Sequence, residues 1–446
     1  MIEASRILIH LEQRLHEDWL IGYSAHQFYH LVQAHLALIR RENVPTILLA
    51  EPNPWRFLAA FLAAVAAECP VFLANPHWKQ QEWQQVFELV QPDLIWGTVR
   101  EEQNLKSDRL LPPASIMIPT GGSSGKIRFA MHTWETLAAS VRGFHRYFGS
   151  RPVNSFCILP LYHVSGLMQF LRSFLTGGRL LILSYKAIKE GARGDDLGHF
   201  FISLVPTQLQ YLLQTDPQWL SRFQTVLLGG SPGWPSLFDT ARNHHIRLAP
   251  TYGMTETASQ IVTLKPKEFL QGNNSSGQVL PHAQVEICSD TGQRLASEQT
   301  GTVTIRSGSL CLGYYPTPFT KPQLLTDDLG YFDAEGYLYI IGRRSQKIIT
   351  GGENVFPAEV EAAILSTQLV QDVCVVGLPD KRWGQIVVAV YVSVHSSPEA
   401  IQQAMQAKLS NYKQPKRWLR VEQLPRNAQG KVNIKQVAQL ALNPKK

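Results

Sequence analysis

The sequence has 446 residues, of which 44% are hydrophobic and 17% are charged, and its formal net charge is +7. One hydrophobic core rarely serves a chain of this length, so we expect two or three globular domains and exclude a disordered chain. The basic residues are scattered and match no nucleic-acid-binding motif. This pattern favours small phosphorylated ligands over nucleic acid as partners.

Cysteine usage and apolar runs bear on the compartment. The five cysteines lie far apart and form no CxxC pair, which argues against a disulfide framework or a zinc site and favours a reducing compartment. The N-terminal residues show no secretory signal, and the longest apolar run, residues 57–67, is too short to cross a bilayer. We therefore expect a cytoplasmic protein with no stable membrane insertion.

The N-terminal part of the sequence alternates between helical apolar spacing and short apolar runs. Short strands that alternate with helices of this length indicate βαβ units and a parallel sheet. The predicted fold class is therefore α/β, with parallel-rich sheets sandwiched between helices. We expect helices at 5–20, 26–41, 55–67 and 77–90 and strands at 44–50, 71–74 and 93–96.

A strand predicted at 115–118 runs into a loop rich in glycine and hydroxyl side chains. Glycines allow positive φ angles and can turn consecutive N–H groups to one side, and hydroxyls and a cation add the donors that a polyphosphate needs. A flexible linker would have a similar composition, so the loop alone leaves both interpretations open. Its residues are Thr120, Gly121, Gly122, Ser123, Ser124, Gly125 and Lys126.

Two established motifs can be tested on the spacing of this loop. A Walker A loop requires G-x-x-x-x-G-K-[ST], but Thr120 takes the place of the first glycine and Ile127 that of the final hydroxyl residue. Residues 121–125 do satisfy G-x-S-x-G, which would make Ser123 the nucleophile of a hydrolase. That motif needs a helix to begin at the serine. The next helical pattern begins only near Thr133, which weakens this alternative.

Small or polar residues follow four later predicted strands. Parallel strands end at one edge of a sheet, where α/β folds bind their ligands, so we expect these residues to line a ligand crevice. The groups are His163 and Ser165; Thr207 and Gln208 after strand 200–205; Gly230, Ser231 and Pro232 after strand 226–228; and residues 251–257.

Two members of these groups leave alternatives open. A lone histidine in an apolar segment is more often a core residue than a functional one. Because His163 stands at the carboxyl end of a strand, where α/β folds bind ligands, the two interpretations are almost equally favoured. A single glutamate in a loop rich in glycine and threonine is usually solvated. Glu256, however, stands beside hydroxyl groups, as a magnesium–nucleotide site requires.

The pattern changes in the C-terminal part of the sequence. Short alternating strands between 277 and 341 predict a small β subdomain that closes over the same edge. We expect an N-terminal domain over 1–342 and a mobile C-terminal lid domain over 343–446. A lysine in a polar loop is usually plain surface, so Lys431 carries little by itself. The C-terminal elements expected are helices at 357–367 and 398–410 and strands at 371–377 and 386–394.

These segments, in this order, resemble the adenylate-forming superfamily of acyl-CoA synthetases, nonribosomal peptide adenylation domains and luciferases. The resemblance covers nearly the whole chain and rests on five segments in register. They are 120–129, similar to the phosphate loop; 252–257, the nucleotide and metal segment; 326–328 with Gly342 and Arg343, the ribose contacts; 351–361, the thioester-forming segment; and Gly430 with Lys431, the lysine loop.

The resemblance implies that the substrates are ATP, CoA and a small carboxylate, with Mg²⁺ as the metal. It makes Lys431, Glu256, Thr255 and His163 catalytic, with Glu256 also holding the metal. Gln346 would be the hinge of the lid domain. The residues that would meet CoA are Gly351 and Gly352.

Two larger sets of binding residues follow from the same resemblance. The ATP-binding residues would be Thr120, Gly121, Gly122, Ser123, Ser124, Gly125, Arg128, Gly230, Ser231, Pro232, Thr251, Tyr252, Gly253, Met254, Thr255, Asp328, Arg343 and Lys431. The acyl-substrate residues would be His163, Ser165, Ser203, Thr207, Gln208, Gly253 and Ser259.

Within the superfamily, the sequence is most similar to the 2-succinylbenzoate–CoA ligases of menaquinone and phylloquinone synthesis. This similarity rests on residues 160–167, 203–209 and 254–260. It implies an AMP-forming acid–thiol ligase that makes an acyl-adenylate and then an acyl-CoA thioester. Another acyl- or aryl-CoA ligase or adenylation enzyme of the superfamily is the alternative. A hydrolase using Ser123 and a non-catalytic nucleotide sensor are less favoured.

The sequence departs from the family pattern at three places. Ile127, Arg128 and Phe129 replace the proline, lysine and glycine that usually follow the phosphate loop, and an arginine keeps the charge but changes the geometry. Asp327 replaces the glycine that precedes the ribose-binding aspartate. Gln346 stands where the hinge residue of the family is often aspartate or lysine. We therefore expect the rotation of the lid domain to differ from that of relatives with a charged hinge residue.

Overall fold

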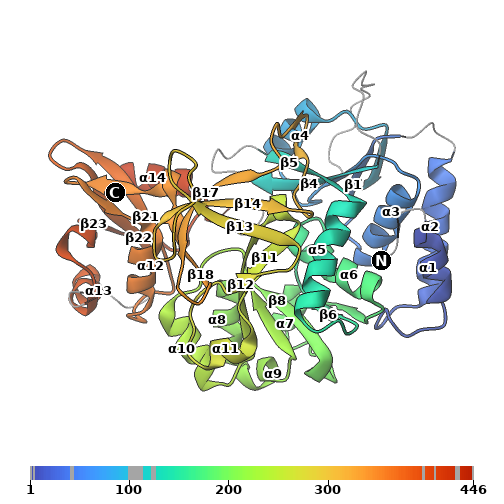
Figure 1. The fold of residues 1–446 in the computed structure, drawn as a ribbon, viewed down its shortest axis with the longest axis horizontal. Helices are drawn as coiled ribbons and strands as arrows, with labels where there is room; N and C mark the ends of the chain where they lie inside the picture. The colour runs from blue at the N-terminus through green and yellow to red at the C-terminus, as the bar shows by residue number, and fades with distance from the viewer. Residues whose placement is uncertain are drawn as a thin grey trace.

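The computed structural model describes residues 3, 6–40, 45–98, 114–121, 127–393, 397–405, 408–426 and 432–443. Within these ranges the chain forms four β-sheets surrounded by helices. The first two sheets fill the N-terminal part, and the fourth sheet lies at the opposite end of the molecule (Figure 1). The predicted α/β class with parallel-rich sheets is confirmed.

The first sheet has seven strands in the order β16-β15-β5-β4-β2-β1-β3. Strands β1 to β4 run parallel, whereas β5 turns back antiparallel to β4. The bounds are β1 Ile47–Ala50, β2 Val71–Leu73, β3 Leu94–Gly97, β4 Ser115–Gly121, β5 Ile127–Thr133, β15 Gly313–Tyr314 and β16 Thr317–Pro318. The helices of this region are α1 Ile7–Gln13, α2 Ala25–Ile39, α3 Pro54–Ala66, α4 Gln80–Leu89 and α5 Trp134–Tyr147.

The second sheet also has seven strands, in the order β12-β11-β10-β9-β8-β6-β7, and its strands from β10 to β7 are parallel. The bounds are β6 Asn154–Cys157, β7 Leu180–Ile182, β8 Phe200–Leu204, β9 Thr225–Leu228, β10 Leu248–Met254, β11 Ser259–Thr263 and β12 Gln278–Val279. Its helices are α6 Val164–Thr176, α7 Tyr185–Lys189, η2 Leu197–His199, α8 Pro206–Thr215, α9 Pro217–Ser221, α10 Pro235–Asn243, η3 Thr255–Thr257 and α11 Pro266–Leu270.

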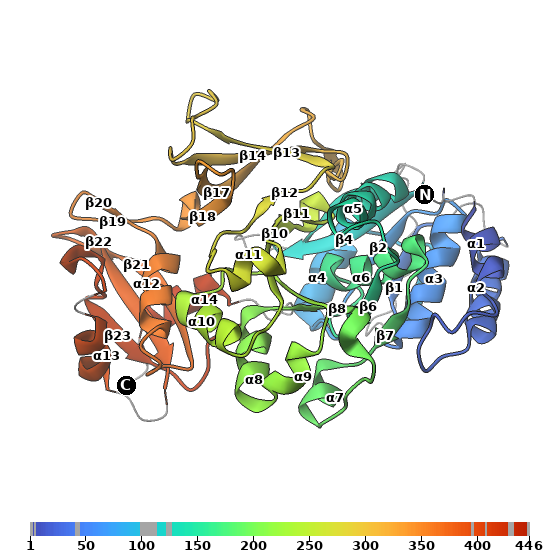
Figure 2. The same ribbon diagram turned by 60° about the horizontal axis from the view of Figure 1, so that its bottom comes forward.

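A third, antiparallel sheet of four strands sits apart from the first two, at the top of the view in Figure 2. It consists of β13 Ala283–Cys288, β14 Gly301–Ser307, β17 Leu324–Phe332 and β18 Leu338–Arg343. Two other stretches of the expected β subdomain, β12 and the hairpin β15–β16, instead extend the second and the first sheet. The segment 277–341 therefore ties all three sheets together.

The fourth sheet belongs entirely to residues after 347. Its strands are β19 Ile348–Thr350, β20 Glu353–Val355, β21 Asp372–Asp380, β22 Gly384–Val392 and β23 Arg417–Arg420. The accompanying helices are η4 Arg344–Gln346, α12 Pro357–Leu365, α13 Pro398–Met405, η5 Asn411–Lys413 and α14 Ile434–Leu442. Separate hydrophobic clusters cover its two faces, so this part has a core of its own.

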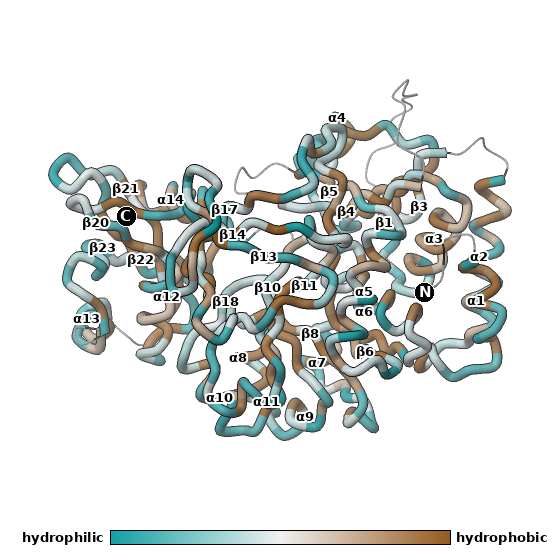
Figure 3. Tube along the Cα trace, in the orientation of Figure 1, coloured by the Kyte–Doolittle hydropathy of each residue, from teal (hydrophilic) through white to brown (hydrophobic). Residues whose placement is uncertain are grey.

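The largest hydrophobic cluster joins the first two sheets through α3, α5 and α6. Helix α3 is apolar on almost every side, and its residues 57–65 are buried. It begins where Asn53 Oδ1 accepts hydrogen bonds from the backbone N–H groups of Trp55 and Arg56. Figure 3 shows the hydrophobic stretches gathered in the interior and hydrophilic stretches at the periphery, for example along α10.

Two helix predictions were wrong in length. The helix expected at 5–20 ends at Gln13, because the buried guanidinium of Arg14 turns to the carbonyl oxygens of Ser173 and Gly178, at 3.3 and 2.8 Å. The helix expected at 398–410 is described over Pro398–Met405, and Lys408 already lies in a turn. Among the described residues, no helix combines the length and the apolar character that crossing a membrane would require.

The G-x-S-x-G alternative is contradicted by the local fold. Strands β4 and β5 flank the loop and pair antiparallel, with Gly121 opposite Ile127 and Thr120 opposite Arg128. The chain thus returns as a strand after the loop, whereas a nucleophile elbow needs a helix there. Helix α5 begins only after β5, as expected, and Thr133 caps it by accepting a hydrogen bond from the backbone N–H of Thr136.

Candidate active site

The polar residues predicted at strand ends lie along one edge of the second sheet. Strands β10, β9, β8 and β6 are adjacent and parallel, so the segments that follow them are brought side by side. Thr255 and Glu256 follow β10, Gly230 follows β9, Thr207 follows β8 and His163 opens α6 after β6. The expected alignment of these residues along one sheet edge is therefore present.

Buried hydrogen bonds fix the nucleotide segment after β10. His132 on β5 is fully buried, and its Nε2 lies 2.8 Å from the carbonyl oxygen of Thr255, while its Nδ1 lies 2.9 Å from Thr136 Oγ1. Burial lowers the pKa of His132 to about 4, so the ring is neutral at pH 7 and Nε2–H donates to the carbonyl. His132 thereby joins the first sheet to the segment that carries Glu256.

Glu256 is 7% exposed, and one of its carboxylate oxygens, Oε1, accepts a hydrogen bond from the hydroxyl of Tyr314 at 2.5 Å. Mg²⁺ prefers oxygen ligands and usually binds through one or two carboxylates together with phosphates and waters. The buried carboxylate of Glu256 is a ligand of this type.

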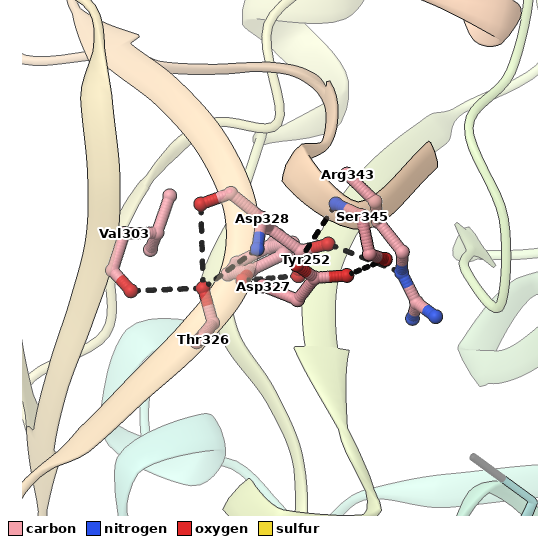
Figure 4. Close-up of polar contacts among 7 residues, drawn as sticks. All are labelled: Tyr252, Val303, Thr326, Asp327, Asp328, Arg343 and Ser345. Carbon is pink, nitrogen blue, oxygen red and sulfur yellow. Dashed lines mark hydrogen bonds and ion pairs between the residues drawn. The ribbon is translucent and has the colours of Figure 1, made fainter. Parts of the chain in front are cut away.

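Asp328 is held in place by a second set of contacts (Figure 4). Its Oδ2 accepts a hydrogen bond from the hydroxyl of Tyr252 at 2.8 Å, and its Oδ1 lies 3.3 Å from Arg343 Nε. Burial and the Asp328 charge raise the pKa of Tyr252, so the phenol keeps its proton and donates. The three residues come from β10, β17 and β18. The structure thus brings together Asp328 and Arg343, the predicted ribose contacts, with Tyr252.

Asp327, the residue that replaces a family glycine, lies close to Ser345, which precedes the predicted hinge residue Gln346 (Figure 4). Its carboxylate accepts hydrogen bonds from the backbone N–H of Ser345, at 3.1 Å, and from the Ser345 hydroxyl. Arg344 forms an ion pair with Asp290 at 2.8 Å and a hydrogen bond with Thr302. Side chains thus anchor the chain to the third sheet up to the residue before Gln346.

The two loops predicted to meet the phosphates lie partly outside the described residues. Thr120 and Arg128 are described and face each other across β4 and β5, on either side of the predicted phosphate loop. The roles predicted for Gly122, Ser123, Ser124, Gly125 and Lys431 concern positions outside the described residues.

Arg172 on α6, which is 3% exposed, was not among the residues predicted from the sequence. Its Nη2 donates to Ser259 Oγ at 2.9 Å and to Gln260 Oε1 at 2.7 Å, and its guanidinium lies over the ring of Phe144. Burial lowers its pKa to about 9, so it keeps its charge at pH 7. Among the described residues, no carboxylate pairs with it. A lone arginine inside an apolar helix was the available sequence signal.

The predicted CoA residues lie in the fourth sheet region. Gly351 and Gly352 have φ angles of +60° and +89°, which favour glycine. A Cβ on Gly351 would lie 2.9 Å from the ring of Trp383, which was not among the residues predicted from the sequence. Trp383 is 38% exposed, and Lys416 Nζ lies 3.2 Å from its ring centre. An exposed aromatic ring with a cation beside it suits a nucleotide base and its phosphates.

The fold and these residues define an AMP-binding enzyme, and the chain belongs to that family. The family model of the AMP-binding enzyme matches residues 113–315, and that of the AMP-binding enzyme C-terminal domain matches residues 359–431. The 2-succinylbenzoate–CoA ligase of Listeria monocytogenes is 34% identical over 343 residues, which cover 75% of this chain and 71% of the relative.

Solved structures agree with this assignment. The o-succinylbenzoate CoA synthetase of Bacillus subtilis in complex with its acyl-adenylate intermediate superposes with a TM-score of 0.86 at 24% identity, over 97% of both chains. The same enzyme in complex with AMP gives a TM-score of 0.85 at 25% identity, over 97% of this chain and 98% of that one. The predicted family resemblance is confirmed.

Proposed function

We propose that this chain is an ATP-dependent, AMP-forming acid–CoA ligase that acts on 2-succinylbenzoate. The named function of the Listeria relative and the acyl-adenylate bound to the Bacillus enzyme support the reaction class. The single observation that carries the choice of acid is Arg172. A buried cation without an acidic partner among the described residues calls for an anionic group on the ligand.

The reaction would proceed in two steps. In the first, a carboxylate oxygen of the acid attacks the α-phosphorus of ATP, and pyrophosphate leaves. In the second, the thiol of CoA attacks the acyl carbon, its proton is released, and AMP leaves. The second carboxylate of 2-succinylbenzoate does not react, and Arg172 with Ser259 would hold it.

The residues of this chain would assist the first step by orienting its partners. Asp328, placed by Tyr252 and Arg343, would accept hydrogen bonds from the ribose hydroxyls. Thr120, Arg128 and Lys431 would meet the negative charge of the phosphates, where preorganised donors matter most. Glu256 would hold Mg²⁺, which, when bound, neutralises charge on the phosphate oxygens.

The second step would need a rearrangement of the C-terminal part. We keep the proposed division into residues 1–342 and 343–446, with the hinge near Gln346. The fourth sheet has hydrophobic clusters of its own, and Asp327 and Asp290 hold Ser345 and Arg344 directly before Gln346. Rotation there would remove Lys431 and present Gly351 and Gly352 to CoA. The cytoplasm, which supplies ATP and CoA, would be the site of action.

Turnover with ATP and CoA across a set of acids tests this function. The set comprises 2-succinylbenzoate, benzoate, a fatty acid and the ester that blocks the unreacting carboxylate of 2-succinylbenzoate. We expect thioester formation to be fastest with the free dicarboxylate, with AMP and pyrophosphate as products. Equal rates with benzoate or with the ester would contradict the choice of acid, and absence of AMP with every acid would contradict the reaction class.

A further inference from the structure

Tyr314 occupies a place in the site that the proposed roles do not explain. It lies in β15, a short strand of the first sheet that follows β14 of the third sheet in sequence, and it pairs with Ala130 of β5. The backbone N–H of Leu312 donates to Met131 O at 2.7 Å, and that of Tyr315 donates to Phe129 O at 2.9 Å. Backbone hydrogen bonds on both sides of Tyr314 therefore fix where its side chain begins.

The same segment is tied to the nucleotide segment. The backbone N–H of Cys311 donates to the carbonyl oxygen of Glu256 at 2.8 Å, so Glu256 is held through its backbone as well as its side chain. The Tyr314 hydroxyl has one proton, and it is donated to Glu256 Oε1. No described residue donates to Oε2, the other oxygen of that carboxylate. The Tyr314 hydrogen bond thus selects which oxygen remains available to a ligand.

Arg128 covers the other side of Tyr314. The central carbon of its guanidinium lies 4.1 Å from the centre of the tyrosine ring, a cation–π contact. Arg128 Nε is buried and has no hydrogen-bond partner among the described residues. Tyr314 therefore contacts both groups, with its ring against the Arg128 guanidinium and its hydroxyl against the Glu256 carboxylate. Within the described part of the chain, no ion pair joins Arg128 directly to Glu256.

The contacts of Tyr314 with both residues matter because the positive charge of Arg128 and the negative charge of Glu256 attract each other. An arginine and a carboxylate that meet readily form a bidentate ion pair. Such a pair would withdraw the carboxylate from a metal and the guanidinium from phosphate. A phenol that engages Arg128 with its ring and Glu256 with its hydroxyl would keep the two charged groups from pairing.

We infer that Tyr314 is a positioning residue for the metal–phosphate part of the site: it orients Glu256 through its hydroxyl and separates it from Arg128 through its ring. The inference rests on the proposed function, because it assumes that Glu256 meets Mg²⁺ and Arg128 meets phosphate. Under this inference Arg128, which replaces the usual lysine of the family, stays available for phosphate because it packs on the Tyr314 ring.

The Tyr314→Phe variant tests the role of the hydroxyl. Binding of ATP is measured by calorimetry at a series of Mg²⁺ concentrations without acid, and AMP binding is measured without Mg²⁺. Because partners of a metal ligand typically contribute about 10- to 100-fold to metal affinity, we expect the Mg²⁺ concentration at half-saturation to rise by about that factor. AMP binding should stay unchanged. An unchanged Mg²⁺ requirement, or an equal loss for ATP and AMP, would overturn the inference.

Two comparisons separate this role from others. Tyr331→Phe removes a hydroxyl from a tyrosine that stacks on Tyr339 in the third sheet, and it should leave the Mg²⁺ requirement unchanged. If the unmodified protein showed no Mg²⁺-dependent binding of ATP, the proposed function would fail. If it showed such binding and Tyr314→Phe behaved identically, only the present inference would fail.

A second pair of variants tests the role of the ring. In Tyr314→Ala the spacer is gone and Arg128 can approach Glu256, so the Mg²⁺ requirement should rise further than in Tyr314→Phe. Adding Arg128→Gln to Tyr314→Ala removes the competing cation and should restore part of the metal response. If the double variant required as much Mg²⁺ as Tyr314→Ala or more, the spacer role would be wrong.

Discussion

The carboxylate of Asp327 accepts hydrogen bonds from both the backbone N–H and the hydroxyl of Ser345, the residue that precedes the proposed hinge at Gln346. The two residues are 18 positions apart, on β17 and in η4. A glycine at position 327, as the family usually has, could not make this contact. The departure from the family pattern thus supplies an anchor directly before the proposed hinge.

Replacing Asp327 by Ala should loosen the segment before the hinge. The contact is exposed, so we expect a loss on the order of 1 kcal/mol, seen as amide hydrogen exchange at Ser345 that is about five-fold faster. Trypsin should also cut faster next to Arg344. Asp239→Ala, which removes a surface partner of Arg242 on α10, is the control. Unchanged exchange at Ser345 would show that the anchor does not hold this segment.

Arg172→Gln should change acid recognition and stability in opposite directions. Loss of a charged hydrogen-bonding group should raise the KM for 2-succinylbenzoate about 10- to 100-fold. Removal of a buried charge without an acidic partner should leave the free energy of unfolding unchanged or raise it. KM and thermal unfolding are measured on the same preparation.

Arg14 offers the matched comparison for Arg172. It is equally buried, but it pairs with Glu17 at 2.6 Å and donates to two backbone carbonyls. Arg14→Gln should therefore destabilise the fold and leave the relative rates with different acids unchanged. If Arg172→Gln behaved like Arg14→Gln, Arg172 would be structural.

His132 should make the protein less stable in mild acid. Its pKa is about 4 in the folded protein and near 6.5 in the unfolded chain, so between these pH values only the unfolded chain binds the proton. Stability should consequently fall as the pH drops, by about 2 kcal/mol from this residue between pH 7 and pH 5. Denaturant unfolding of His132→Gln at both pH values should show a smaller loss than the unmodified protein.

The control for this pH effect is His244→Gln, which replaces an exposed histidine after α10. It should retain the full loss of stability between pH 7 and pH 5. Equal pH dependence in His132→Gln and the unmodified protein would contradict the assignment of a buried neutral ring.

Site residues that lie just after a predicted strand could be predicted from the sequence. Contacts between residues of distant strands could not. Glu256 stands two residues after the end of β10, and His163 opens α6 after β6, so their place at the sheet edge is a local property. Tyr314 lies 58 positions from Glu256, and the packing of a two-stranded hairpin brings it there. No spacing rule in the sequence encodes such a contact.

The fold shows the same division between local and distant information. The alternation of strands and helices predicted the parallel sheets, because each βαβ unit is visible in a short window. Strand β5 was missed although Ile127, Phe129 and Met131 alternate, since a strand that returns beside β4 after a glycine-rich loop looks like connecting chain. The early end of α1 depends on carbonyl groups of Ser173 and Gly178, more than 150 positions away.

Lys431→Ala should separate the two proposed steps. Pyrophosphate release from ATP and 2-succinylbenzoate should fall by at least about 100-fold, because a cation is then missing where charge develops. Thioester formation from supplied 2-succinylbenzoyl-adenylate and CoA should be largely spared, since this lysine is proposed to have left the site. Rapid-mixing assays of each step measure both rates. Equal losses would contradict a role confined to the first step.

The most direct test of the account is exchange of labelled pyrophosphate into ATP in the absence of CoA. If the site forms an acyl-adenylate reversibly, exchange should require both 2-succinylbenzoate and Mg²⁺ and should need no thiol. Exchange that is absent under these conditions, or that proceeds equally without the acid, would contradict the central claim that this site joins a carboxylate to AMP.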